Sequence, residues 1–124
     1  MNQHRFYNSF TKLWAQNDLA AVGNKLGILN LLSRQEDELK TYAEVPSLVT
    51  HITEIKGNKR GDLIVECSKW KQNAVRLIDV NRGRVISGWP ETNTKIKLPT
   101  VAGFSDNDEL SVANTNGFIN FFKI

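Results

Sequence analysis

The sequence predicts an all-β fold in which short antiparallel sheets follow one another along the chain. Polar and apolar residues alternate with a period of two in many segments, and no long segment has an apolar stripe of helical period. A similar segment also occurs three times, with the equivalent positions Ser33, Asp79 and Lys123 lying 46 and 44 residues apart. A repeat of about 45 residues with four short strands is typical of a WD-type β-propeller blade.

In the first unit, strands are expected near residues 10–15, 18–22, 28–32 and 39–42. They alternate or are continuously apolar, as strands with one or both faces covered should be. The acidic run at 35–38 separates the last two strands and is expected to be a solvated loop.

In the middle unit, residues 51–55 alternate polar and β-branched side chains, which predicts the inner strand. Further strands are expected at 63–67, 74–79 and 84–89. Glycine-containing turns separate the first strand from the second and the third from the fourth. Pro90 should end the outer strand because it has no amide proton to donate.

In the last unit, strands are expected at 101–104, 110–113 and 118–124. Residues 1–124 therefore predict a partial WD40-type β-propeller of about three blades, with four, four and three strands, at approximately 9–42, 48–89 and 99–124. Propellers typically close with four to eight blades, so three blades form an open arc. We expect the arc to be completed by missing blades of a longer product or, as the alternative, by a partner chain.

Composition places the chain among ordinary folded domains. It has 124 residues, 40% of them hydrophobic, and a net charge of +3, which permits contact with nucleic acid without requiring it. The longest apolar run, Leu19 to Val22, is too short to cross a membrane. Residues 1–10 lack the apolar core of a secretory signal. The single cysteine, Cys67, indicates a reducing compartment, cytosol or nucleus.

The sequence predicts no catalytic, cofactor-binding or metal site. His51 and Glu54 lie three apart on an expected strand and should point to opposite faces, while His4 lies in the N-terminal tail. Residues 106–109 look like a cation loop but lack its later glycine and glutamate, so a hairpin turn is expected. Cys67 reads as a buried structural thiol. An enzyme is therefore not expected.

One aromatic residue differs from the others. Most large aromatic residues recur at strand positions and should pack between blades; these are Trp14, Trp89, Phe104, Phe121 and Phe122. Trp70, however, lies between Lys69 and Lys71 in an inserted loop. Such a tryptophan can stack on a base or anchor a peptide. The alternative is that it folds over the blade rim among the lysine stems.

A basic cluster is expected on one rim of the middle blade. The turns after its first and third strands emerge on the same side of an antiparallel sheet, and they bring together five cations: Lys56, Lys59, Arg60, Arg82 and Arg84. Asp62 and Asp79 dilute this charge. The cluster is interpreted either as a contact for RNA phosphate or an acidic partner, or as an ordinary solvated face.

Several segments together resemble one WD-repeat family, the U-three small nucleolar RNA-associated protein 18 family. The similar segments are residues 21–30, 46–50, 68–77, 85–90 and 104–117. Ala74-Val75-Arg76-Leu77 followed by Trp89-Pro90 is moderately specific, whereas the last hairpin alone is common among WD proteins. The likeness runs from about Leu19 to Ile124 and corresponds to the family's C-terminal blades.

The resemblance implies a non-catalytic scaffold in the nucleus and nucleolus. It would belong to the UtpB complex of the small-subunit processome, support 18S pre-rRNA processing, and contact other processome proteins and the backbone of U-three snoRNA or pre-rRNA. The family's N-terminal motif for recruiting a helicase and exosome has no counterpart here. The Trp-Asp signature is also degenerate, since only Asp79 keeps the acid.

Two other functions remain open from the sequence. The first is a WD-repeat peptide-binding adaptor unrelated to ribosome assembly. The second, an all-β hydrolase or lectin, would need convergent polar groups that the pattern does not provide.

Overall fold

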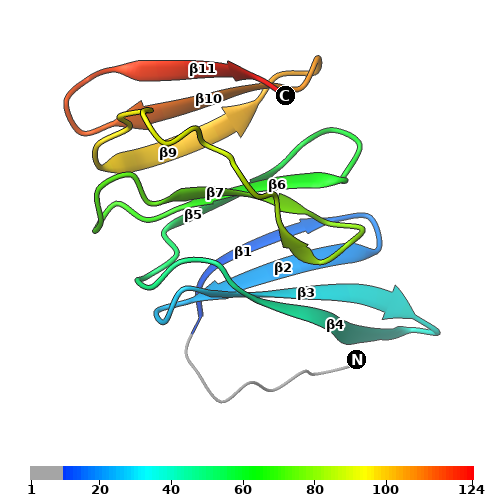
Figure 1. Cartoon of the computed structure of the whole chain (residues 1–124). Helices are drawn as coiled ribbons and strands as arrows, with labels where there is room; N and C mark the ends of the chain where they lie inside the picture. The colour runs from blue at the N-terminus through cyan, green and yellow to red at the C-terminus, as the bar shows by residue number, and fades with distance from the viewer. Residues whose placement is uncertain (1–9) are drawn as a thin grey trace.

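The computed structural model describes residues 10–124, which form eleven strands and no helix (Figure 1). The strands make three antiparallel sheets of four, four and three strands, each in chain order. This confirms the predicted all-β fold and its strand count. His4 and the expected lack of a signal segment fall on residues 1–9, outside the described part. Within residues 10–124, no helix has the length and apolar character needed to span a membrane.

The strand bounds follow the predicted repeat. The first sheet contains β1 (Phe10–Gln16), β2 (Leu19–Asn24), β3 (Ile28–Gln35) and β4 (Glu38–Pro46). The second contains β5 (Glu54–Gly57), β6 (Leu63–Cys67), β7 (Val75–Asp79) and β8 (Arg84–Val85). The third contains β9 (Pro99–Phe104), β10 (Glu109–Asn114) and β11 (Ile119–Lys123).

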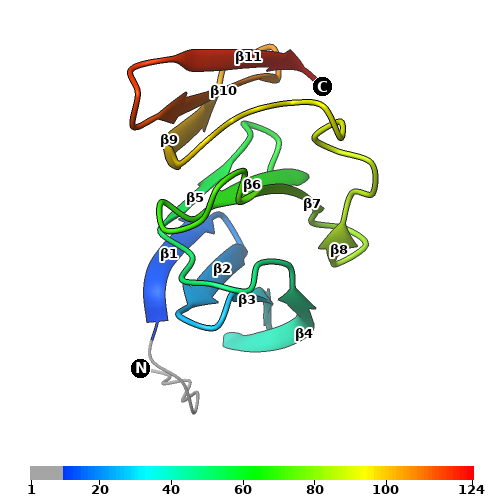
Figure 2. The same cartoon turned by 60° about the vertical axis from the view of Figure 1, so that its left-hand side comes forward.

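The sheets are stacked face to face, as Figures 1 and 2 show from two directions. Their first strands contact one another, β1 with β5 and β5 with β9. The first strand of each sheet is therefore the inner strand of a blade. The chain crosses to the next sheet only after it has completed the outer strand of the previous one.

Two strands of the second sheet are shorter than predicted. β5 begins at Glu54 rather than at residue 51, because the amide of Ile52 donates to the carbonyl of Asn24 in the first sheet, at 3.1 Å. β8 covers only two residues of the expected 84–89. One further ladder bond joins the amide of Ile86 to the carbonyl of Leu77, and Gly88 then leaves the extended conformation with a φ of 77°.

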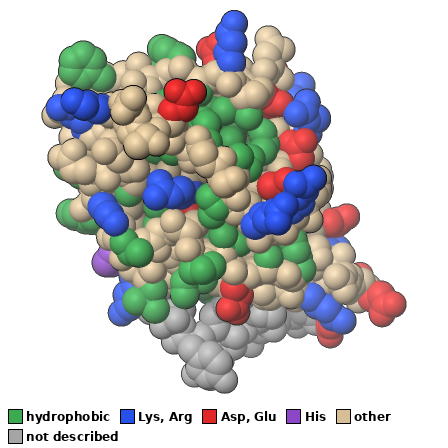
Figure 3. Space-filling model, viewed as in Figure 1, with side chains coloured by type: hydrophobic (Ala, Val, Ile, Leu, Met, Phe, Trp, Pro, Cys, Tyr) green, Lys and Arg blue, Asp and Glu red, His purple; other side chains and the backbone are tan. Residues whose placement is uncertain are grey.

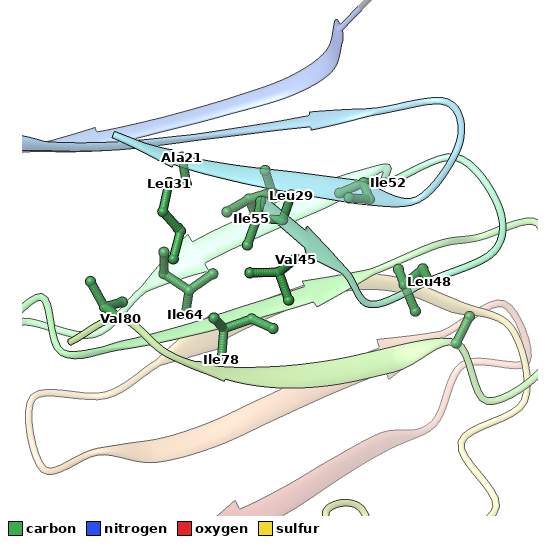
Figure 4. Packing of buried hydrophobic residues seen from close by; sticks show 11 residues of the cluster. Ala21, Leu29, Leu31, Val45, Leu48, Ile52, Ile55, Ile64, Ile78 and Val80 are labelled. Carbon is green, nitrogen blue, oxygen red and sulfur yellow. The ribbon is translucent and has the colours of Figure 1, made fainter. Parts of the chain in front are cut away.

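Two layers of buried apolar side chains separate the three sheets. Leu29, Leu31 and Ile64 belong to the layer between the first two sheets (Figure 4). Val65 and Leu110 belong to the layer between the second and third. Neighbouring residues of β6 thus enter different layers, which explains why this strand is continuously apolar. Burial of one such side chain stabilises the fold by about 1.5–3 kcal/mol.

Aromatic packing between sheets follows the prediction at most positions. Trp14 packs against the first layer, and Trp89, Phe104 and Phe122 pack against the second. The rings of Trp89 and Phe122 meet edge to face, with centroids 5.2 Å apart. Phe121 was expected to pack as well, but it is 64% exposed. Successive strand residues point to opposite faces, so Phe121 lies on the outer face of the third sheet.

Candidate binding surfaces

The sheet topology creates two opposite rims. The turns β1–β2, β3–β4, β5–β6, β7–β8 and β9–β10 lie on one side, which we call the turn rim. The turns β2–β3, β6–β7 and β10–β11 lie on the other side, together with the connections between sheets. We call this side the crossover rim. The two rims are seen at the right and the left of Figure 1.

The predicted basic residues lie on the turn rim, where three of the five are ion-paired. Lys59 Nζ is 4.0 Å from an oxygen of Asp106. Arg82 Nε is 3.7 Å from an oxygen of Asp79. No ion pair forms at Lys56 or Arg84 among the described residues, and both are exposed.

Arg60 makes the shortest of these ion pairs. Its guanidinium lies 2.5 Å from Asp108 Oδ2 in the third sheet and 3.3 Å from Asp62 Oδ2 in its own turn. The arginine therefore links neighbouring sheets and has less charge to offer a ligand. Ion pairs this exposed contribute little to stability individually.

Asn58 organises the same turn and was missed from the sequence. The residue is fully buried, and its Oδ1 accepts the amides of Asp62 and Leu63 at 3.0 and 3.1 Å. Its Nδ2 donates to Asp62 Oδ1 at 2.5 Å and to Asp108 Oδ1 at 3.2 Å. The hydrogen bond from Asn58, with smaller help from Arg60, lowers the pKa of Asp62. One signal in the sequence could have indicated this role. A polar residue opens the first hairpin in two of the units, and Ser105 accepts a backbone amide in the third unit as Asn58 does in the second.

The loop that carries Trp70 lies on the crossover rim, away from the basic turns. Trp70 is 65% exposed, and Lys69 Nζ lies 5.1 Å from the centre of its ring. The amide of Lys69 donates to Thr53 Oγ1 at 3.0 Å, which holds the start of the loop. Lys71 is exposed beside them. The eight predicted binding residues therefore divide into two groups on opposite rims.

A buried acidic group lies beneath this loop. Ser47 donates a hydrogen bond to Glu66 Oε1, while Glu66 Oε2 is buried without a partner among the described residues. Burial raises the pKa of Glu66 to about 8, although Arg76 acts in the opposite direction. A small cavity of about 80 Å³ adjoins Ser47 and Arg76. A larger cleft of about 460 Å³ lies between Arg76 and Trp89.

The thiol and the histidine do not form a reactive pair. Cys67 is fully buried, and burial raises the pKa of its thiol to about 12, with Glu54 and Glu66 acting in the same direction. Its thiolate is therefore disfavoured at neutral pH. His51 is exposed whereas Glu54 is buried and lies 3.6 Å from Lys12 Nζ. In the described part of the chain, no cluster of three or more histidine, cysteine or acidic residues is placed to hold a metal.

Three curated proteins are similar to this chain over most of its length, while no family model matches it. The U3 small nucleolar RNA-associated protein 18 homolog of Caenorhabditis elegans is 30% identical over 112 residues, covering 86% of this chain and 26% of that protein. The corresponding protein of Saccharomyces cerevisiae is 27% identical and covers 88% of this chain and 19% of its own length. The probable Schizosaccharomyces pombe protein is 24% identical and covers 87% of this chain and 22% of its own length. The chain thus spans only about a quarter or less of these relatives.

Solved structures with the same fold are WD40 propellers. The structure of U3-55K has a TM-score of 0.77 at 8% identity and covers 98% of this chain, which matches 38% of that chain. The WD40 β-propeller domain of Doa1 has a TM-score of 0.68 at 14% identity, covering 94% of this chain and 37% of its own. At these identities the likeness shows the fold alone, and that fold is the WD40-type β-propeller.

Proposed function

Because this chain belongs to the family of U3 small nucleolar RNA-associated protein 18, we propose that it is a non-catalytic scaffold in ribosome biogenesis. The observation that carries the proposal is similarity to three members over 86–88% of the chain. The names of these relatives associate them with the U3 small nucleolar RNA. The proposed place of action is therefore the nucleolus within the nucleus.

The finer proposal is membership of the UtpB complex in the small-subunit processome, in support of 18S pre-rRNA processing. A WD40 blade array suits this role, because it offers loops on two rims that can engage different partners. The buried thiol of Cys67 and the separation of His51 from Glu54 agree with a scaffold role. The proposed partners are other processome proteins.

A direct RNA or acidic-partner contact is proposed for the basic residues of the turn rim. Lys56 and Arg84 are the most available, because the other three cations are ion-paired. Lys69, Trp70 and Lys71 are proposed as a second contact on the crossover rim. Cations and exposed aromatic side chains are the groups that phosphates and partner proteins engage most often.

Affinity purification of the tagged chain from cells tests the function. We expect U3 small nucleolar RNA and processome proteins to co-purify, the chain to localise to the nucleolus, and mature 18S rRNA to fall after depletion. Recovery of cytosolic partners without U3 RNA, together with unchanged 18S rRNA, would contradict the proposal.

A five-residue variant tests the turn rim. Changing the five basic residues of this rim to Ser should reduce RNA or partner binding at moderate salt, because phosphate contacts depend on charge. Changing Arg34 and Lys40 of the first sheet to Ser provides a control on the same rim. Unchanged affinity of the five-residue variant would refute the turn-rim contact.

A further inference from the structure

Acidic residues are concentrated on the turn rim. Nine of the thirteen acidic residues of the chain lie in or beside its turns: Asp18, Glu36, Asp37, Glu38, Asp62, Asp79, Asp106, Asp108 and Glu109. In Figure 3, acidic side chains gather mostly along the right-hand edge, where the turn rim lies. The left-hand edge shows mainly basic and hydrophobic side chains. The molecule is therefore electrically unequal between its two rims.

The crossover rim contains a continuous set of segments without a single acidic residue. We call it the acid-free belt, and it consists of residues 24–27, 47–53, 68–74, 96–98 and 114–118. It carries four lysines: Lys25, Lys69, Lys71 and Lys97. None of these four makes an ion pair among the described residues, whereas Lys59, Arg60 and Arg82 of the turn rim are paired.

Hydrogen bonds join the first half of the belt. The amide of Ile52 donates to the carbonyl of Asn24 at 3.1 Å, which joins the β2–β3 turn to the connection between the first two sheets. The amide of Lys69 then donates to Thr53 Oγ1 at 3.0 Å, which joins that connection to the Trp70 loop. Three segments distant in sequence thus form one surface.

The second half is joined in the same way. The amide of Asn73 donates to the carbonyl of Lys97 at 2.7 Å, and Asn73 Oδ1 accepts the amide of Lys97 at 3.1 Å. The amide of Thr115 donates to the carbonyl of Leu98 at 3.1 Å. The belt therefore runs without interruption from the first sheet to the third.

Four of the belt segments also expose a large apolar side chain. Leu26 is 51% exposed, Val49 78%, Trp70 65% and Phe118 66%. Lysines lie next in sequence to two of these residues, Leu26 and Trp70. An apolar anchor flanked by unpaired cations is complementary to a chain segment that carries both apolar and acidic side chains.

We propose that the acid-free belt docks an extended, acidic segment of a partner protein whose leucine or aromatic side chains contact Trp70 and its apolar neighbours. The aliphatic residues Leu26 and Val49 favour protein over RNA, because bases stack on aromatic rings and gain little from aliphatic side chains. The inference rests on the proposed scaffold function, which requires protein docking sites, and assigns one of them to a specific surface.

Selection of random dodecapeptides displayed on phage against the full chain tests the inference. The selected peptides should combine Asp or Glu with Leu, Phe or Trp. The best peptide, made synthetically, should bind Lys69→Ser/Trp70→Ser/Lys71→Ser at least about tenfold more weakly than the unaltered chain by fluorescence anisotropy. Lys25→Ser/Leu26→Ser, in the first-sheet segment of the belt, should also weaken binding of the same peptide.

A matched control separates the belt from general charge effects. Arg34→Ser/Leu39→Ser/Lys40→Ser removes two cations and one exposed apolar side chain from the turn-rim side, and it should leave peptide affinity unchanged. Thermal unfolding of all variants establishes that they fold. Selected peptides without acidic residues, or binding that does not depend on the belt, would overturn the inference.

Two further measurements test whether RNA or a second copy of the chain binds the belt instead of a peptide. Belt-dependent binding of dodecauridine without belt-dependent peptide binding would make the surface an RNA site and overturn the inference. Belt-dependent self-association in light scattering, again without peptide binding, would assign it to a second copy. Failure of peptide binding while U3 RNA still co-purifies would reject the belt alone, whereas absence of U3 RNA from the unaltered chain's purification would reject the proposed function.

Discussion

Side-chain amides of asparagine replace missing backbone partners in the turns of this molecule. Asn24 Oδ1 accepts the amides of Leu26 and Ile28, and Asn114 Oδ1 accepts those of Asn116 and Phe118. The two asparagines occupy equivalent places in the first and third sheets. Backbone amides in a turn lack a partner from the strand ladder, and the asparagine side chain supplies one.

Replacing Asn58 by Ala should destabilise the protein by about 3 kcal/mol, because two backbone amides and Asp62 lose their buried partner. Urea unfolding measures the effect. Asn107→Ala, in an exposed position of the equivalent turn, should change stability by less than about 0.5 kcal/mol. Equal stability of the two variants would contradict the role assigned to Asn58.

Glu66 should make stability depend on pH. Its folded pKa of about 8 lies above the ordinary 4.5, so the folded state holds a proton that the unfolded state releases. The stabilisation is complete below pH 4.5 and is lost as pH rises through the folded pKa, by up to about 5 kcal/mol. Glu66→Gln should remove this decline and be the more stable form at pH 9, as measured by urea unfolding across pH. A parallel decline in the variant would exclude Glu66 as the cause.

Asp62 acts in the opposite sense at acid pH. Its folded pKa is lowered, so the stability it contributes is present above the ordinary value of 3.8 and is lost as pH falls through the folded pKa. The two groups together predict greatest stability at mildly acidic pH.

Contacts between elements depend on glycine where two inner strands approach. A Cβ added to Gly57 of β5 would lie 2.2 Å from Cζ2 of Trp14, which β1 supplies. A Cβ on Gly103 of β9 would meet no atom within 4 Å. Two strand glycines thus have opposite environments, although the sequence gives no sign of the difference.

Gly57→Ala should cost about 2 kcal/mol, since the new methyl group must displace the indole, whereas Gly103→Ala should be neutral or slightly stabilising. Thermal and urea unfolding measure both. Combining Gly57→Ala with Trp14→Leu should cost less than the sum of the single changes, because the smaller side chain leaves room. Additive costs would show that the strain lies elsewhere.

The strands themselves were largely predictable from the sequence, and their ends were not. Alternation and short apolar runs located the strands, but the shortening of β5 and β8 depends on a hydrogen bond to Asn24 of another sheet and on the conformation of Gly88. Such features depend on contacts distant in sequence. The repeat of about 45 residues therefore does not predict where these strands end.

At the scale of the molecule, the outer face of the third sheet is apolar and open to solvent. Val101 is 52% exposed, Ile119 56% and Phe121 64%. Because β11 alternates, Phe122 points the other way and packs on Trp89. An exposed apolar face of this kind promotes association.

We expect the chain to self-associate through this face as its concentration rises. Ile119→Lys/Phe121→Lys should weaken that association about tenfold, as measured by sedimentation or light scattering. The variant should retain its unfolding temperature, because neither side chain is buried. Gln35→Lys/Asn107→Lys adds the same charge elsewhere and serves as the control. If both double variants weaken association equally, net charge and not the sheet face is responsible.

The candidate sites were only partly predictable, because contacts between different sheets decide which of their residues are free. Topology correctly placed the basic turns on one side, but it did not show that Arg60 is held by Asp108, 48 residues further along the chain. The exposure of Trp70 also depends on how its loop is held. Lys97 lies in the belt only through its contact with Asn73. The sequence did not mark the belt at this point, because the connection that carries Lys97 also contains the acidic residue Glu91.

The separation of acids from unpaired lysines gives the molecule an electric dipole that its net charge of +3 does not reveal. Salt screens charges over about 10 Å, so the local charge of each rim decides which rim approaches a charged surface first. On a cation-exchange matrix the protein should therefore be retained longer than its net charge suggests, with one fixed orientation. The turns held by Asn58 and Arg60 would then face the buffer.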